Sequence, residues 1–90
     1  MTLEQAKRVA RSYLGERRMI ILGCIPKPSK QRSEDLTEQH PLHYALSCCE
    51  RLQSLDSTPK TMRWLGFVQG VLWACRVYTV EQLREHNRDA

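Results

Sequence analysis

Histidine and cysteine are common metal ligands, and the sequence holds three of the first and four of the second. His40 and His43 lie close together at the predicted start of a helix, and Cys48 follows on the same helix. A structural zinc site is usually marked by closely spaced ligand pairs such as CxxC or HxxxH, and the sequence contains neither pattern. We therefore predict no metal site and no cofactor. The ligands considered are Cys24, His40, His43, Cys48, Cys49, Cys75 and His86.

Covalent or acid–base catalysis would need a nucleophile beside a histidine and an orienting carboxylate, or a tuned pair of carboxylates. No serine in the sequence is flanked by the glycines of a nucleophile elbow. The adjacent acids Glu34 and Asp35 belong to a charged segment in which burial does not tune a carboxyl pKa. We predict that the protein is not an enzyme and has no catalytic residue.

Charge is distributed unevenly along the 90 residues, whose formal net charge is +4. Residues 33–56 are acidic, whereas residues 1–32 carry eight lysines and arginines against only Glu4 and Glu16. Such a basic surface can bind an acidic protein, neutralise nucleic-acid phosphates, or be solvated helix surface. Aromatic residues do not alternate with the basic ones, as a single-strand stacking platform requires. We predict a partner-binding basic face made of Lys7, Arg8, Arg11, Arg17, Arg18, Lys27, Lys30 and Arg32.

Capping patterns and apolar spacing predict the helices that must position these residues. Thr2 and Gln5 have the spacing of a capping box, as do Thr79 and Gln82. Proline at a first helical position opens the two middle helices, and Gly15 is a plausible stop for the first. The predicted helices span about residues 2–14, 41–55, 59–77 and 79–86.

Residues 16–40 carry weaker signals. Met19 to Leu22 is an apolar run too short for periodicity to assign, and without a second strand to pair it we predict a buried helical or irregular segment. Residues 24–39 contain Pro26, Pro28 and many charges, which predicts an exposed connector with one helical turn near 33–37.

Targeting signals and cysteine surroundings predict where the protein works. No apolar run approaches the roughly 18 residues of a membrane span, and the first residues lack a secretory leader pattern. Cys24 and Cys75 have apolar neighbours, and Cys48 and Cys49 are adjacent. We predict reduced core thiols in a cytoplasmic protein with no membrane partner.

The helix predicted over residues 59–77 is apolar on two sides, with Met62, Leu65, Leu72 and Trp73 on one and Trp64, Phe67, Val68, Val71, Cys75 and Tyr78 on the other. Such a helix is either central in the domain or partly covered by an oligomer interface. Gly66 and Gly70 remove bulk from one edge and predict close helix packing there. We predict a homodimer, and we assign the core or oligomer role to Trp64, Phe67, Val71 and Trp73.

The stretch Arg63 to Ala74, RWLGFVQGVLWA, followed by Tyr78 to Arg84, YTVEQLR, resembles small uncharacterised proteins of tailed phages and prophages of Gram-negative bacteria. The resemblance covers roughly the C-terminal third and implies a phage accessory protein that acts inside the bacterial cell. It implies no activity and no functional residues, and the basic N-terminal third lies outside it.

These observations together predict an all-α protein, with residues 1–90 forming a single helical domain. Its fold is a compact small bundle of about four helices with a buried central helix at residues 59–77. We expect a non-enzymatic accessory protein that binds a host or phage protein through the basic first helix and the connector, an interaction that could inhibit or redirect that protein. The alternative is a small basic DNA- or RNA-binding regulator.

Overall fold

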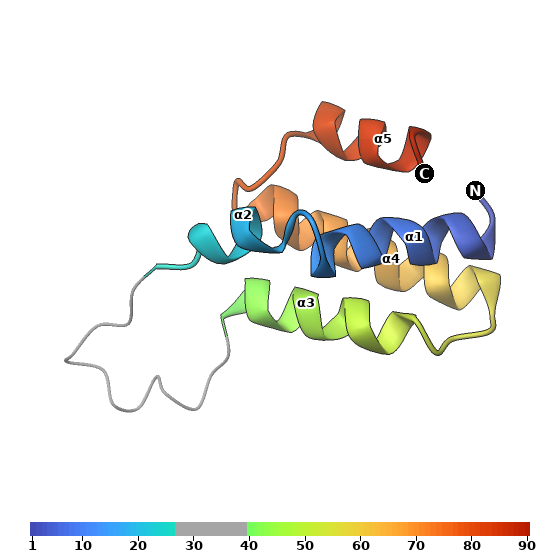
Figure 1. The fold of residues 1–90 in the computed structure, drawn as a ribbon. Coiled ribbons are helices and arrows are strands. Elements are labelled where there is room, and N and C mark those ends of the chain that lie inside the picture. Colours follow the sequence, from blue (N-terminus) through green and yellow to red (C-terminus); the bar gives the residue numbers. More distant parts are fainter. Residues whose placement is uncertain (27–39) are drawn as a thin grey trace.

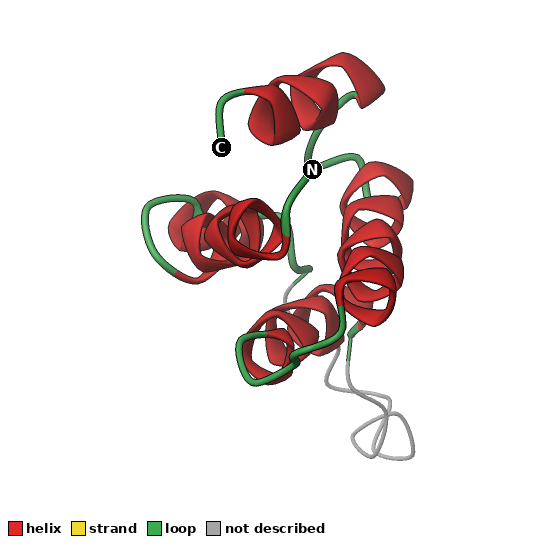
Figure 2. Cartoon of the chain, turned by 90° about the vertical axis from the view of Figure 1, so that its right-hand side faces the viewer, coloured by secondary structure: helices red, strands yellow, loops and turns green. Residues whose placement is uncertain are grey.

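The computed structural model describes residues 1–26 and 40–90, and within these ranges the regular secondary structure is entirely helical (Figures 1 and 2). The helices α1, α3 and α4 lie side by side, and α5 lies on the opposite side of α1 from α3 (Figure 1). This arrangement confirms the predicted all-α bundle. The bounds are α1 Leu3–Leu14, α2 Arg18–Gly23, α3 Pro41–Leu52, α4 Thr58–Ala74 and α5 Val80–Arg88.

Both predicted capping boxes are present. At the start of α1 the Gln5 amide donates to the Thr2 hydroxyl at 3.1 Å, and the Thr2 amide donates to the Gln5 side chain at 2.8 Å. Thr79 and Gln82 make the same two bonds before α5, at 3.1 and 2.9 Å. Each box satisfies amides that a helix start would leave unpaired, so these two helix boundaries follow from local sequence alone.

The helix that contacts every other one is α1, not α4 as the sequence predicted. Its side chains Ala6, Val9, Ala10 and Tyr13 are buried among residues of all the other helices. The two alanines let neighbouring helices approach closely, because they add little bulk to the surface of α1. α3 and α4 complete the core with Leu42, Ala45, Leu46, Cys48, Cys49, Leu52, Leu65, Val68 and Leu72.

The prediction of a helix buried on both sides is wrong for α4. Leu65, Val68 and Leu72 are buried on one face, although the sequence analysis had assigned Val68 to the side opposite the other two. On the other face Phe67 and Trp73 are 51% and 56% exposed. A chain this short forms few helices, and those that are described cover only one side of α4.

The end of α4 also differs from the prediction, because the helix stops at Ala74 instead of about Val77. Arg76 has φ of 60°, in the left-handed region. Its amide donates to the Trp73 carbonyl at 3.0 Å, and the Val77 amide donates to the Leu72 carbonyl at 2.9 Å. These two bonds form a Schellman ending, which usually has glycine at the position that Arg76 occupies here. The missing glycine explains why the sequence placed the boundary too late.

Residues 18–23 are helical, but the predicted burial of this segment is wrong for most of it. α2 buries only Ile21, whereas Met19 and Ile20 are 77% and 53% exposed. A helix this short contacts α1 and α3 with one side only. Cys24, predicted as a core thiol, is exposed as well, while Cys48 and Cys49 are buried and Cys75 is half-buried.

Of two further predictions, one falls mostly on residues that the structure does not describe, and the other concerns the described helices. Most of the predicted connector, including its helical turn near 33–37, lies in residues 27–39, outside the described ranges. Among the helices that are described, none is both long and apolar enough to cross a membrane.

Replacing Arg76 by glycine should stabilise the domain. A side chain in the left-handed region costs roughly 1 kcal/mol that glycine avoids, and Arg76 is exposed, so little packing is lost. We expect Arg76→Gly to raise the free energy of unfolding, measured by urea denaturation, by up to about 1 kcal/mol. The control Arg76→Ala keeps the strained Cβ and should give no such gain; an equal gain from both variants would contradict this explanation.

Candidate functional site

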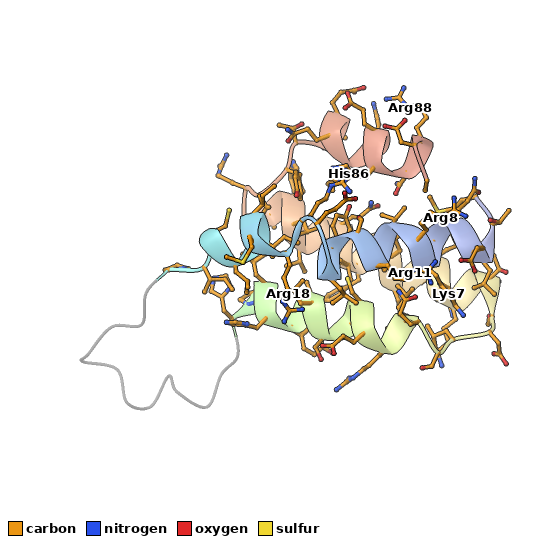
Figure 3. The ribbon with its side chains drawn as sticks, viewed as in Figure 1. Lys7, Arg8, Arg11, Arg18, His86 and Arg88 are labelled. Atoms are coloured by element: carbon orange, nitrogen blue, oxygen red, sulfur yellow. The ribbon has the colours of Figure 1, made fainter. Side chains whose placement is uncertain are left out.

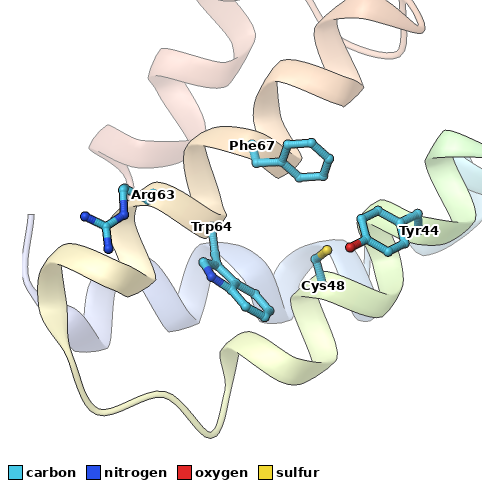
Figure 4. Close-up of a pocket in the computed structure, with 5 residues that line it drawn as sticks. All are labelled: Tyr44, Cys48, Arg63, Trp64 and Phe67. Atoms are coloured by element: carbon cyan, nitrogen blue, oxygen red, sulfur yellow. The ribbon is translucent and has the colours of Figure 1, made fainter.

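An apolar hollow of about 320 Å³ forms a groove between α3 and α4 (Figure 4). Tyr44 and Cys48 line it from α3, and Trp64 and Phe67 line it from α4. Among the described residues that line the groove, Arg63 is the only charged one. Tyr44 and Cys48, like Trp64 and Phe67, are one helical turn apart, so two adjacent turns of each helix face the groove.

Tyr44 and Phe67 form the exposed part of this groove. Their rings meet edge to face, with centroids 5.9 Å apart, and the two side chains are 44% and 51% exposed. An aromatic pair of this geometry contributes about 0.5–1.5 kcal/mol beyond the area it buries. The groove therefore has an exposed aromatic pair along its rim.

Cys48 lies at the floor of the groove, with the Tyr44 side chain pointing toward it (Figure 4). Burial raises the pKa of the Cys48 thiol, outweighing a hydrogen bond from Tyr44 that lowers it. A raised pKa keeps the sulfur protonated at neutral pH, whereas a nucleophilic cysteine needs the thiolate. The groove thus has the chemistry of a binding site and does not activate its cysteine. Cys49, fully buried beside it, has its pKa raised by burial to about 12.

A second cluster of polar residues joins α1, α4 and α5. The Gln69 side-chain amide donates to the Tyr13 hydroxyl at 3.1 Å and to the Asn87 carbonyl oxygen at 2.8 Å. Asn87 returns a bond to the Gln69 carbonyl oxygen at 3.1 Å. The Tyr13 hydroxyl lies 2.8 Å from Nδ1 of His86. Because Tyr13 already accepts from Gln69, its own proton is available to His86.

This polar network requires a neutral His86. A neutral imidazole protonated on Nε2 accepts the Tyr13 proton at Nδ1, so each bond that joins Tyr13, Gln69, Asn87 and His86 then has one donor and one acceptor. Burial lowers the pKa of His86 and raises that of Tyr13 to about 12, so both stay neutral near pH 7. The Tyr78 and His86 rings pack edge to face with their centroids 4.6 Å apart, so Tyr78 covers the apolar side of the network. We interpret the network as structural, since it holds α5 onto the bundle.

The predicted basic face is only partly assembled. On α1, Arg8 lies on the side toward α5, whereas Arg11 and the half-buried Lys7 lie on the side toward α3 (Figure 3). Arg18 lies at the start of α2. Arg17 is half-buried before α2. Lys27, Lys30 and Arg32 lie outside the described ranges.

Local acids engage part of that basic surface. Arg11 bonds to Glu4 at 2.7 Å and to Gln53 at 3.1 Å, and the bond from Arg11 holds the pKa of Glu4 below its usual value. Arg17 pairs with Glu16 at 3.2 Å. A smaller hollow of about 180 Å³ between α1 and α5 mixes both signs of charge, being lined by Arg8, Val9, Ser12, Glu16, Arg17, His86, Asp89 and Ala90. The local potential is thus less positive than the residue count suggested.

The residues assigned to a core or oligomer role separate into two groups. Trp64 and Val71 are half-buried against the core, whereas Phe67 and Trp73 are exposed. The close packing predicted at Gly66 and Gly70 is absent from the described chain, because a Cβ at either position would meet no atom within 4 Å.

The metal candidates do not converge. In the described parts of the chain no group of three or more histidine, cysteine, aspartate or glutamate side chains could hold an ion. His40 instead caps α3, where its Nδ1 accepts the Leu42 amide at 3.1 Å.

Sequence reasoning missed most of the groove and the network. Tyr44 was left unassigned because it falls off the apolar stripe of its helix, and that position is what places it on the groove rim. Asn87 gave no signal, since ordinary surface amides have the same spacing. Gln69, a glutamine within an otherwise apolar stretch, was the one available clue to the network.

Tyr13 and Tyr78 offer a matched test of this network, because removing either hydroxyl is the same chemical change. Tyr13→Phe leaves His86 and Gln69 short of a partner and should cost about 1–3 kcal/mol of folding stability. The buried Tyr78 hydroxyl has no partner among the described residues, so Tyr78→Phe should be neutral or stabilising. Urea denaturation of both variants measures this, and an equal loss in both would rule out the network.

The lowered pKa of His86 predicts a specific loss of stability in mild acid. Unfolding returns the imidazole toward its usual pKa of 6.5, so below that pH the unfolded chain binds a proton that the folded chain resists. Stability should therefore fall as the pH drops from about 7 through the lowered pKa of the folded state. In His86→Gln this component should disappear, as measured by denaturation midpoints across pH 5–8. The control His43→Gln changes an exposed histidine and should keep the wild-type pH dependence.

Comparison with known proteins assigns no family. No protein-family model matches the chain, and neither does any curated protein or solved structure. The resemblance to phage accessory proteins therefore stays a prediction, and the candidate sites rest on the geometry of this chain.

Proposed function

We propose that this domain is a non-enzymatic binding protein that holds a segment of a partner protein in the groove between α3 and α4. If the resemblance to phage proteins holds, the partner is a phage protein or a protein of the bacterial host. The observation that carries the proposal is the exposed aromatic pair Tyr44–Phe67 above an apolar hollow. Exposed aromatic side chains beside a pocket are typical anchors of protein interfaces.

The lining of the groove favours a helical partner segment. An amphipathic helix laid between α3 and α4 would place one or two apolar side chains on Cys48 and Trp64. Arg63 would then face a carboxylate on the partner, because it is the one charge in the lining. The raised pKa of Cys48 agrees with a binding role, since it disfavours a nucleophilic thiolate.

We also propose that the domain binds as a homodimer. The exposed aromatic surface extends past the groove to Trp73 on the outer side of α4, which a partner in the groove would leave uncovered. Large exposed apolar side chains on one helix face are typical of association surfaces.

In the alternative proposal, the basic residues of α1 would bind nucleic acid. Lys7, Arg8 and Arg11 are the described cations that would contact phosphates. Such contacts would make the affinity fall steeply with salt, whereas an apolar groove binds with little dependence on salt. The pairing of Arg11 with Glu4 favours the groove.

Affinity capture of the tagged protein from bacterial lysate, with and without nuclease, identifies the partner. The proposal is then tested by measuring how tightly the purified partner binds variants of this protein. Tyr44→Ala should weaken that binding about tenfold or more, because an aromatic anchor is lost. Met19→Ala removes an even more exposed apolar side chain away from the groove, 77% against 44% for Tyr44, and should change nothing. Loss of the captured partners on nuclease treatment would overturn the proposal in favour of the nucleic-acid regulator. The same conclusion would follow if the double variant Arg8→Glu, Arg11→Glu abolished binding while Tyr44→Ala kept it.

A further inference from the structure

The groove between α3 and α4 continues past the residues that line its hollow. The two helices run in opposite directions and are joined by a short turn (Figure 1). Side chains one helical turn apart on α3 therefore face side chains one turn apart on α4 in reverse order. Tyr44 meets Phe67 at the end away from the turn, which we call the aromatic end. Cys48 faces Trp64 across the middle of the groove (Figure 4).

Cations gather at the other end of the groove, beside the turn. Arg51 follows Cys48 by three residues, so it lies on the groove side of α3. Lys60 precedes Trp64 by four residues, which places it on the groove side of α4. Burial raises the pKa of the Cys48 thiol, and the charge of Arg51 is one of the opposing effects that lower it, in agreement with a guanidinium close to the groove. Arg51, Lys60 and Arg63 are all exposed and form what we call the cationic end.

No acid of the described chain forms an ion pair with the cationic end. The ion pairs of the described residues lie on α1, on α5 and in the segment between α1 and α2. Glu50 and Asp56 are the acids nearest in sequence, and neither pairs with a residue of this end. Because Arg51 and Lys60 carry the same charge on opposite sides of the groove, a negative group between them would lower their electrostatic energy. The cationic end is therefore suited to the carboxylates of a partner.

A strand of nucleic acid fits this arrangement less well than a protein helix does. Its phosphates repeat at every nucleotide, so a surface that binds it carries cations along the whole path of the strand. Here the cations of the described groove gather at one end, and the other end is aromatic. An amphipathic helix can present apolar side chains and carboxylates a few turns apart on one face. Such a helix therefore matches both ends of the groove at once.

We propose that the groove binds an acidic amphipathic helix of a partner protein, with the apolar side chains of that helix at the aromatic end and its carboxylates at the cationic end. The inference rests on the proposed function of the groove and adds the charge and the orientation of the bound segment. Lys60 and Phe67 are seven residues apart, which is about 10 Å along α4. The carboxylates of the partner should therefore lie about two helical turns from its apolar anchor.

Two fluorescent alanine-based helical peptides test the charge preference of the full chain. Both carry leucine anchors on one face, and two turns away one peptide has glutamates where the other has lysines. Fluorescence anisotropy should show the glutamate peptide binding about tenfold more tightly, which is the effect of two or three exposed ion pairs. In the double variant Arg51→Glu, Lys60→Glu this order should reverse. The control Arg8→Glu, Arg18→Glu makes the same change in net charge at exposed positions away from the groove and should keep the wild-type order.

Tyr44→Ala separates this inference from the proposed function. If the wild type binds both peptides equally and Tyr44→Ala weakens both, the groove binds helices without regard to charge, which overturns the inference alone. If Tyr44→Ala leaves both affinities unchanged, the peptides bind elsewhere and the proposed function of the groove fails as well. The inference is also overturned if neither peptide binds, or if a single-stranded oligonucleotide binds more tightly than the glutamate peptide and is released by Arg51→Glu, Lys60→Glu.

Discussion

The hydroxyl of Tyr13 is the polar contact on which the arrangement of the bundle depends. Its side chain is fully buried on α1, and its oxygen meets Gln69 of α4 and His86 of α5. α5 buries only Leu83 within its own length, so apolar contact alone holds it weakly. A buried network is stabilising when each donor has an acceptor, and this condition fixes where α5 can lie.

With α5 held on one side of α1, the opposite side of the bundle belongs to α3 and α4. α3 covers one flank of α4, and the polar network covers part of the other. The chain described here has no further helix to place over the outer face of α4. Phe67 therefore lies between the groove toward α3 and the uncovered outer face of α4.

Several of the charged residues pair with one another within the domain. Glu4 and Glu16 lie beside the arginines of the N-terminal region, and Glu81 lies 3.7 Å from both Arg84 and Arg88 on α5. Exposed pairs of this kind contribute little to stability, but they reduce the positive potential that a free basic surface would present. Specific recognition by this domain is therefore better supported at its aromatic surface than at its cationic one.

Local chemistry in the sequence determined the helices and most of their buried faces. Thr2 and Thr79 mark helix starts through hydrogen bonds to nearby residues, and the prolines mark them because their missing N–H would have had no helical partner. The apolar stripe of α3 is buried as predicted. The sequence did not predict the left-handed conformation of Arg76, because glycine is the usual sign of that backbone geometry and an arginine gives no such sign. Only tertiary packing decided that α1 contacts every other helix, that one side of α4 stays open, and that Tyr44 meets Phe67 across a groove. Periodicity reports which residues share a face, whereas the number of helices available to cover that face is a property of the whole fold.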